Sequence, residues 1–171
     1  LPIAAIFNKT DLIQELLNRD GYDVNHQHSV SKATALMLAA MTKSDDTNLI
    51  DLLLKHDAKI DSVDKVGRTP LMYAASYGNI PMMIKIISMD NTQVHKRDEN
   101  KLTAFAHAIS FGQIEAMKLL LEHGESIDNI ETTRLSHLSH LMLATDTKLA
   151  NNTAPLEFLL WNEAAVNARN D

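Results

Sequence analysis

The chain of 171 residues contains no cysteine. This absence excludes disulfide bonds, thiolate zinc sites and thiol catalysis. Only five glycines occur, and they are spread along the chain instead of forming a phosphate-binding loop. No apolar run approaches the roughly 18 residues needed to cross a bilayer, and no basic segment followed by an apolar one opens the sequence. We therefore expect no membrane partner and a cytoplasmic location.

Basic residues are also fewer than acidic ones. Lysine and arginine total 16 against 22 acidic residues, which gives a formal net charge of -6. Such a chain repels nucleic-acid phosphates, so we expect no nucleic-acid partner. The 45% hydrophobic content nevertheless predicts one domain with a substantial apolar interior.

The informative feature is an internal repeat. One motif starts at Thr34, Thr69, Thr103 and Ser139, so successive starts lie 35, 34 and 36 residues apart. A second, Leu-rich or Ile-rich segment follows each of them at similar distances. These segments are Asp51–Asp57, Lys85–Asp90, Lys118–Gly124 and Glu157–Glu163.

Each unit is predicted to hold two antiparallel helices. Thr or Ser can cap the first helix, and Pro70 stands where a missing N–H does no harm. The second segment repeats apolar residues at helical spacing and is followed by Gly or polar turn residues. Polar stretches such as 61–68 and 95–102 are predicted to form extended finger loops. Because one unit cannot bury its apolar faces alone, the units must stack.

These residues resemble the ankyrin repeat pattern T-P-L-H-x-A-A, most clearly in Thr69-Pro70-Leu71 with Ala74-Ala75. The resemblance implies an all-α fold, an α-solenoid of stacked helix-turn-helix ankyrin repeats with β-turn finger loops. We expect a single domain over residues 1–171, cut inside the pattern at both ends. The expected repeats are 1–25, 26–61, 62–95, 96–128 and 129–167, with 168–171 opening a further one.

The sequence departs from the ankyrin pattern in two ways. The His that tightens the turn in this family is replaced by Met37, Met72, Ala106 and Met142, so we expect less rigid turns. Extra residues are predicted near 43–46 and 146–154, where insertions cost little closure entropy. Whether these insertions carry individual function or reflect neutral drift stays open.

No residue pattern points to catalysis or to a metal. The eight histidines include the pairs His26 with His28 and His137 with His140, but neither pair has a third ligand at fixed spacing. Ser136, His137 and Asp146 could be assembled into a triad, yet nothing supplies an oxyanion hole. We therefore expect no enzyme activity, no catalytic residues, no cofactor and no metal site.

The resemblance places a binding groove along the fingers and one side of each first helix. In its register the groove residues are the fifth and ninth of each motif. These are Leu38 and Thr42, Tyr73 and Tyr77, His107 and Phe111, and Leu143 and Thr147. Tyr73, Tyr77, His107 and Phe111 are thus predicted to line one binding surface, where aromatic residues dominate interface energetics. The alternative is that they pack into the core between repeats.

The adjoining fingers carry a locally basic patch. It comprises Lys65, Arg68, Lys96, Arg97 and Lys101, with Asp64 and Glu99 among them. An apolar centre with a charged rim is typical of protein interfaces. We expect a partner with an apolar anchor and acidic residues, whereas a solvated loop of mixed charge is the alternative.

Together these features predict a monomeric protein-protein interaction module, or scaffold, that binds a protein partner through its concave groove and fingers. Lys65, Arg68, Arg97 and Lys101 join the four groove residues as candidate contacts. Two alternatives stay open. One is a regulatory or substrate-recruiting segment of a larger enzyme or of a bacterial effector acting in the host cytosol, with the catalytic domain elsewhere. The other is an architectural spacer.

Overall fold

The computed structural model describes residues 1–19, 21–42, 47–125 and 157–158. Within the described part of 1–125 the secondary structure is helical, with no strand. The α-helices are α1 (Pro2–Ile6), α2 (Thr10–Leu17), α3 (Ala35–Ala39), α4 (Asn48–Lys55), α5 (Pro70–Tyr77), α6 (Ile80–Met89), α7 (Ala104–Ser110) and α8 (Ile114–Glu122), and the 3₁₀ helix η1 spans Asn91–His95. The all-α solenoid expected from the sequence is confirmed.

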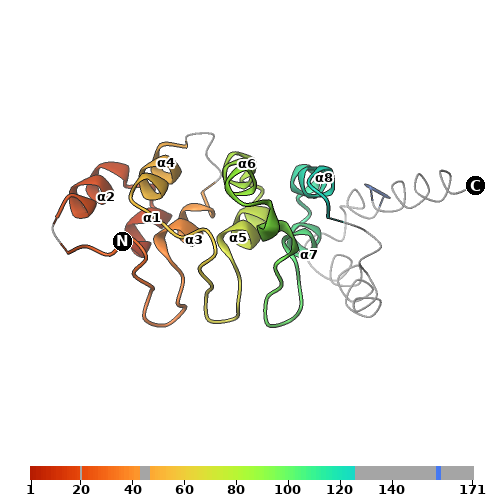
Figure 1. The fold of residues 1–171 in the computed structure, drawn as a ribbon, viewed down its shortest axis with the longest axis horizontal. Helices are drawn as coiled ribbons and strands as arrows, with labels where there is room; N and C mark the ends of the chain where they lie inside the picture. The colour runs from red at the N-terminus through yellow and green to blue at the C-terminus, as the bar shows by residue number, and fades with distance from the viewer. Residues whose placement is uncertain (20, 43–46, 126–156, 159–171) are drawn as a thin grey trace, which may run out of the picture.

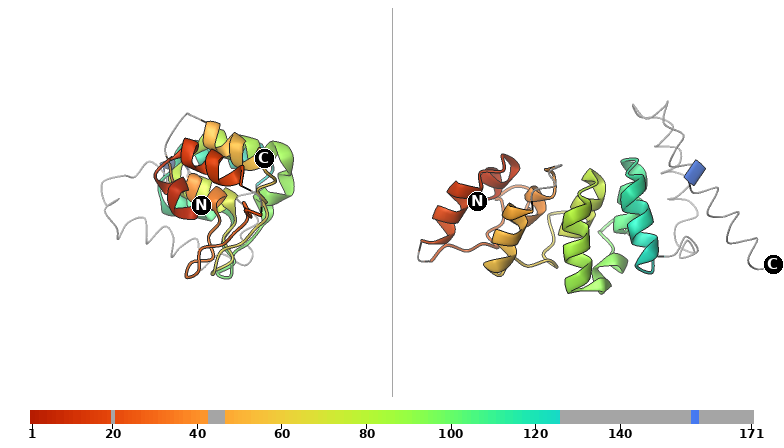
Figure 2. Two further views of the ribbon diagram at one scale, coloured as in Figure 1. Left: turned by 90° about the vertical axis from the view of Figure 1, so that its left-hand side faces the viewer. Right: turned by 90° about the horizontal axis from the view of Figure 1, so that it is seen from above.

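The helices form two rows along the length of the molecule (Figure 1). The first helices α1, α3, α5 and α7 make one row, and the second helices α2, α4, α6 and α8 make the other. The finger loops project together from one side of the rows, as the view along the stack shows (Figure 2). Each helix pair falls inside one of the first four expected repeats. The expected repeat 129–167, the start of another at 168–171 and the insertions at 43–46 and 146–154 lie outside the described residues.

Threonine starts each of the three later first helices. The hydroxyl oxygens of Thr34, Thr69 and Thr103 accept hydrogen bonds from the backbone N–H three residues on, at 3.3, 3.4 and 3.5 Å. Each bond satisfies one of the N–H groups that a helix start leaves without a partner. The repeated Thr therefore sets the helix start in each of these three units.

Methionine replaces the histidine of the ankyrin pattern in two of these turns and still bonds the cap. The Sδ atoms of Met37 and Met72 accept hydrogen bonds from the backbone N–H of Thr34 and Thr69, at 3.5 and 3.4 Å. Sulfur is a weak acceptor. A reciprocal cap is thus present without histidine, with a weak acceptor, while the lower rigidity of the turns stays a prediction.

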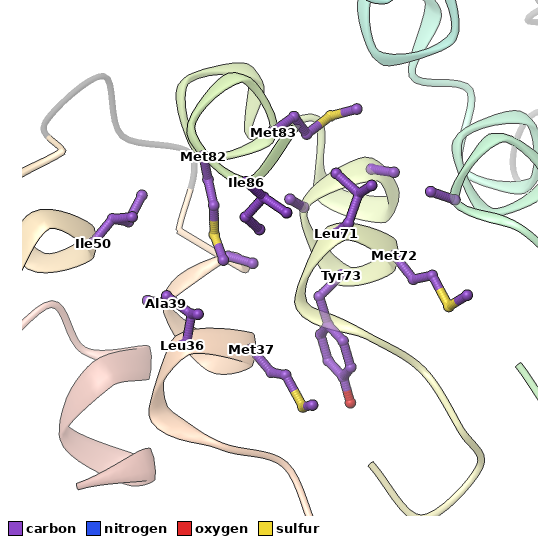
Figure 3. Packing of buried hydrophobic residues seen from close by; sticks show 14 of the residues in the cluster. Leu36, Met37, Ala39, Ile50, Leu71, Met72, Tyr73, Met82, Met83 and Ile86 are labelled. Atoms are coloured by element: carbon purple, nitrogen blue, oxygen red, sulfur yellow. The ribbon is translucent and has the colours of Figure 1, made fainter. Parts of the chain in front are cut away.

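The apolar core runs continuously between the repeats. Fully buried side chains of the first helices, such as Leu36 and Leu71, belong to one cluster with those of the second helices, such as Met82 and Ile86 (Figure 3). Ile109 of α7 belongs to the same cluster. Each such side chain contributes about 1.5–3 kcal/mol when buried. Alanine pairs within α3 and α5 are also fully buried, which lets adjacent first helices approach closely. No single unit encloses this core.

Polar contacts join consecutive repeats as well. Asn79, which is buried, donates from Nδ2 to the carbonyl oxygen of Thr42 at 2.9 Å, and its Oδ1 accepts from the backbone N–H of Met82 at 3.1 Å. One side chain therefore caps α6 and also holds the preceding repeat. A buried amide bonded at both ends fixes the spacing of the two units.

The fingers are bonded to one another through their backbones. Lys65 N donates to Ser31 O at 2.9 Å, and Glu99 N donates to Val66 O at 3.1 Å. Each finger also turns through one left-handed residue, namely Lys32, Gly67 and Lys101, at φ 58°, 80° and 67°. A Cβ added at Gly67 would lie 3.0 Å from Glu99 N. Glycine is required there by its φ angle and also by the closeness of the next finger.

We expect Gly67→Ala to lower the free energy of unfolding by about 2 kcal/mol or more, because it combines left-handed strain with a collision between fingers. Gly21→Ala is the matched control, since Gly21 has φ 81° but open space around its Cβ position. The control should cost only the conformational strain, about 1 kcal/mol. Urea unfolding measures both variants, and equal losses would contradict the finger contact.

Candidate functional site

A pocket lies in the corner between the fingers and the row of first helices. Its volume is about 240 Å³. Three successive repeats line it, with the following residues: Ser31, Ala33, Leu38, Met41, Arg68, Tyr73, Ser76, Tyr77 and Phe111. We refer to these residues as the groove pocket. Because no single repeat supplies them, the pocket exists only in the stacked form.

Two rings at the helix ends give the groove pocket its apolar wall. Tyr77 ends α5 and is half-buried, whereas Phe111 follows α7 and is 51% exposed. Their ring centroids are 6.2 Å apart, with the planes inclined at 31°. This separation is within the range of favourable aromatic contacts. An exposed phenylalanine already oriented by a neighbouring ring is well suited to contact a partner.

Tyr73 contributes mainly to the internal structure. Its side chain is 8% exposed. Its hydroxyl donates to Asp64 Oδ2 at 2.8 Å and accepts from Arg68 Nη2 at 3.0 Å. Burial, together with the hydrogen bond to Asp64, raises the pKa of Tyr73 to about 12. For Tyr73 the structure therefore favours the core alternative, although one edge of the side chain still lines the groove pocket.

Arg68 is neutralised by the same cluster. Its guanidinium forms an ion pair with buried Asp64, at 2.8 Å from Nη2 to Oδ2, and its Cζ lies 4.8 Å from the centroid of the Tyr73 ring. Arg68, which the sequence assigned to the basic patch of the fingers, lines the groove pocket, but its charge is balanced within the protein. Arg68 can therefore offer a guanidinium surface to a ligand without much net charge.

Asp64 holds this finger together. Burial alone would raise the pKa of the Asp64 carboxyl, but hydrogen bonds from the backbone N–H groups of Arg68 and Val66 and from the Tyr73 hydroxyl keep it below its ordinary value. The carboxylate is thus ionised at neutral pH and accepts on both oxygens. A charged carboxylate bonded in this way fixes the finger against α5.

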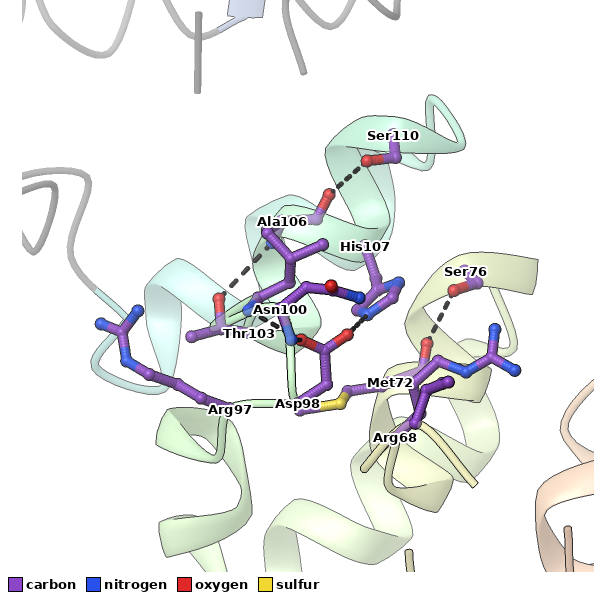
Figure 4. A network of polar contacts seen from close by, with 12 residues as sticks. Arg68, Met72, Ser76, Arg97, Asp98, Asn100, Thr103, Ala106, His107 and Ser110 are labelled. Atoms are coloured by element: carbon purple, nitrogen blue, oxygen red, sulfur yellow. Dashed lines mark hydrogen bonds and ion pairs between the residues drawn. The ribbon is translucent and has the colours of Figure 1, made fainter. Parts of the chain in front are cut away.

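His107 repeats the arrangement in the next unit. It is 8% exposed, and its Nε2 lies 3.1 Å from Oδ2 of buried Asp98 (Figure 4). Oδ1 of Asp98 accepts from the backbone N–H groups of Asn100 and Leu102. The sequence assigned His107 to the exposed groove, whereas the structure turns it towards its own finger and does not include it in the groove pocket. The cause is Asp98, nine residues before His107, just as Asp64 stands nine residues before Tyr73.

The remaining predicted cations lie on the fingers outside the pocket wall. Lys65, Arg97 and Lys101 are exposed, and Nη1 of Arg97 donates to the Lys101 carbonyl oxygen at 3.0 Å. The structure therefore does not gather the eight predicted contacts into one site. Arg68, Tyr73, Tyr77 and Phe111 line the groove pocket, whereas Lys65, Arg97, Lys101 and His107 do not.

Sequence reasoning missed four lining residues, Ser31, Ala33, Met41 and Ser76. Met41 and Ser76 are the eighth residues of their motifs. Positions five, eight and nine share one helix face because they are three and four residues apart. That spacing could have identified both residues, whereas Ser31 and Ala33 depend on how the first finger packs.

The described residues include no group of three or more His, Asp or Glu side chains that could hold a metal ion. None of the described helices is long and apolar enough to cross a membrane.

We expect Asp64→Asn to lower the free energy of unfolding at pH 7 by about 2 kcal/mol, since the amide no longer balances Arg68. Because the pKa of Asp64 is lower in the folded state than its unfolded value of about 3.9, its stabilisation is present above that pH and lost as pH falls through the folded pKa. The stability gap between wild type and variant should therefore narrow below about pH 4. Urea unfolding from pH 7 to 3, with exposed Asp61→Asn as control, measures the gap, and a constant gap would contradict this role.

Comparison with known proteins agrees with the geometry. The family model of ankyrin repeats (3 copies) matches residues 1–98. Ankyrin repeat protein FPV031 of fowlpox virus is 31% identical over 132 residues, covering 75% of this chain and 38% of that protein. Human ankyrin repeat and SOCS box protein 6 is 24% identical over 159 residues, covering 92% of this chain and 37% of that protein.

A third relative is mouse Rabankyrin-5, 29% identical over 128 residues, which covers 66% of this chain and 11% of that protein. The chain thus spans under two fifths of the length of each of these three relatives. The Thr caps, the paired helices, the stacked fingers and the matched family model lead to one conclusion. The chain belongs to the ankyrin repeat family.

Proposed function

We propose that this chain is a protein-binding module whose contact surface is the groove pocket and the fingers beside it. Ankyrin repeats generally serve as protein-protein interaction modules. The observation that carries the proposal is an open apolar pocket in which Phe111 is half exposed and its ring is tilted against that of Tyr77. Exposed aromatic surface beside a concavity is characteristic of binding sites.

The proposed partner presents an apolar anchor flanked by acidic residues. The anchor would cover Phe111 and Tyr77, which removes apolar surface from water. Lys65, Arg97 and Lys101 stand exposed on the fingers of a chain whose net charge is -6. Arg68 contributes less charge than its residue type suggests, because Asp64 balances it. Acidic groups of the partner would therefore be drawn to the finger lysines.

The proposal also includes a non-catalytic role, a monomeric state and a cytoplasmic location. Ankyrin repeat proteins are typically non-catalytic binding modules. The second candidate function is recruitment of a substrate or regulator for a larger protein. It is favoured by one observation, namely that this chain spans only 38% of the fowlpox relative and 37% of the human one.

We expect the double variant Tyr77→Ala/Phe111→Ala to weaken binding about 30-fold, because truncating central aromatic contacts costs about 2 kcal/mol or more. The ligands are peptides selected from a random display library on the wild-type chain, and fluorescence anisotropy gives Kd. Phe7→Ala is the matched control, since Phe7 is 67% exposed at the first repeat and absent from the pocket wall. Selected peptides that bind all three chains equally would contradict the proposed surface.

A further inference from the structure

The wall of the groove pocket combines four groups that interact specifically with aromatic rings. These are the rings of Tyr77 and Phe111, the thioether of Met41 and the guanidinium of Arg68. We infer that the pocket selects an aromatic side chain, next to a carboxylate, of an acidic protein segment in preference to an aliphatic side chain of the same size. This inference rests on the proposed binding function and specifies the chemistry of the partner.

The volume of the pocket fits one aromatic side chain. The cavity measures about 240 Å³, whereas an apolar cavity of about 150 Å³ is enough to bind benzene in another protein. The additional space accommodates the link from a ring to its backbone. A pocket of this size does not require two side chains to fill it, so a single anchor residue suffices.

Ring chemistry then decides between an aromatic and an aliphatic anchor. A ring placed beside Tyr77 and Phe111 gains edge-to-face or offset contacts beyond its buried area. A thioether makes more favourable contacts with the edge of an aromatic ring than with an alkyl group. A guanidinium likewise makes favourable contacts with the face of an aromatic ring. An aliphatic side chain gains only the free energy of burying apolar surface, which an aromatic side chain gains as well.

The structure holds these groups in place before any ligand arrives. Arg68 is fixed by its ion pair with Asp64 and lies over the Tyr73 ring. Tyr77 and Phe111 are already 6.2 Å apart between centroids. Binding therefore loses little side-chain freedom, which favours affinity in a small pocket.

Charge complementarity is the reason to expect a carboxylate next to the anchor residue of the partner. Lys32 stands between two pocket residues, Ser31 and Ala33, and Lys65 bonds the Ser31 carbonyl oxygen through its backbone. Both lysines are exposed. Both side chains therefore branch from backbone that adjoins the pocket, whereas the cation inside the pocket is paired with Asp64. A carboxylate adjacent to the anchor residue would meet two positively charged side chains at this rim.

The direct test compares N-acetyl-phenylalaninamide with the amide of N-acetyl-cyclohexylalanine, its saturated counterpart of nearly equal shape. The 171-residue chain, labelled at the methionine methyl groups, is titrated with each compound by NMR, and Met41→Leu assigns the pocket signal. We expect the aromatic amide to shift the Met41 methyl resonance with Kd of about 1 mM, and to bind about tenfold more tightly than the saturated amide.

The rim is tested with a second pair of probes, N-acetyl-Asp-Phe-amide and N-acetyl-Asn-Phe-amide. We expect the acidic dipeptide to bind about threefold more tightly at low ionic strength, and the advantage to vanish in 0.5 M salt. The variant Lys32→Gln/Lys65→Gln should remove the same advantage while keeping the preference for an aromatic ring. An advantage that survives in this variant would overturn the assignment of the carboxylate to the rim.

Two variants check the ring preference. Tyr77→Leu/Phe111→Leu keeps an apolar wall and should reduce the tenfold preference to the part that Met41 and Arg68 contribute, whereas Phe7→Leu should leave the tenfold preference intact. Equal affinities on the wild-type chain, or no shift at Met41 with either amide, would overturn the inference. If library peptides still depend on Tyr77 and Phe111, the binding function stands without the aromatic preference; if they do not, both fail.

Discussion

Burial between neighbours is the interaction on which everything else in this molecule depends. A helix pair of this length has apolar residues on faces that its own partner cannot cover. Leu36 and Leu71 are fully buried where α3 packs against α5 and α5 against α7. The same dependence extends to polar groups, since Asn79 bonds the carbonyl of the preceding repeat and the fingers bond one another through their backbones.

The candidate site is a direct product of this stacking. The groove pocket takes its fingers from the second and third units and its rings from the third and fourth. The same helices and fingers therefore serve both stability and the proposed binding, but different side chains serve each. In the third and fourth units an aspartate of the finger bonds the fifth residue of the motif, as Asp64 bonds Tyr73 and Asp98 lies against His107. The ninth residues Tyr77 and Phe111 are more exposed, and Phe111 is the most exposed residue of the pocket.

The repeat spacing, the Thr caps and the alanine pairs were enough to predict the helices, their pairing and the family, because each signal is local and recurs in every unit. The site was predicted only in part. Tyr77 and Phe111, which the sequence assigned to the groove, line the pocket, whereas Tyr73 and His107 are buried. The missed signal was the aspartate nine residues before each of them. The neutralisation of Arg68 also depends on that aspartate, and a pattern of residue types does not reveal which charges are paired in space.

The most direct test of the groove as the contact surface is site-specific photo-crosslinking. Phe111 and Ile84 are each replaced in turn by a photoreactive benzoylphenylalanine, since both are 51% exposed but Ile84 lies on α6 in the row of second helices. A peptide selected on the wild-type chain is bound and irradiated, and mass spectrometry locates the adduct. We expect crosslinks from position 111 and background yield from position 84. Equal yields from the two positions, or adducts only from position 84, would contradict the proposed surface.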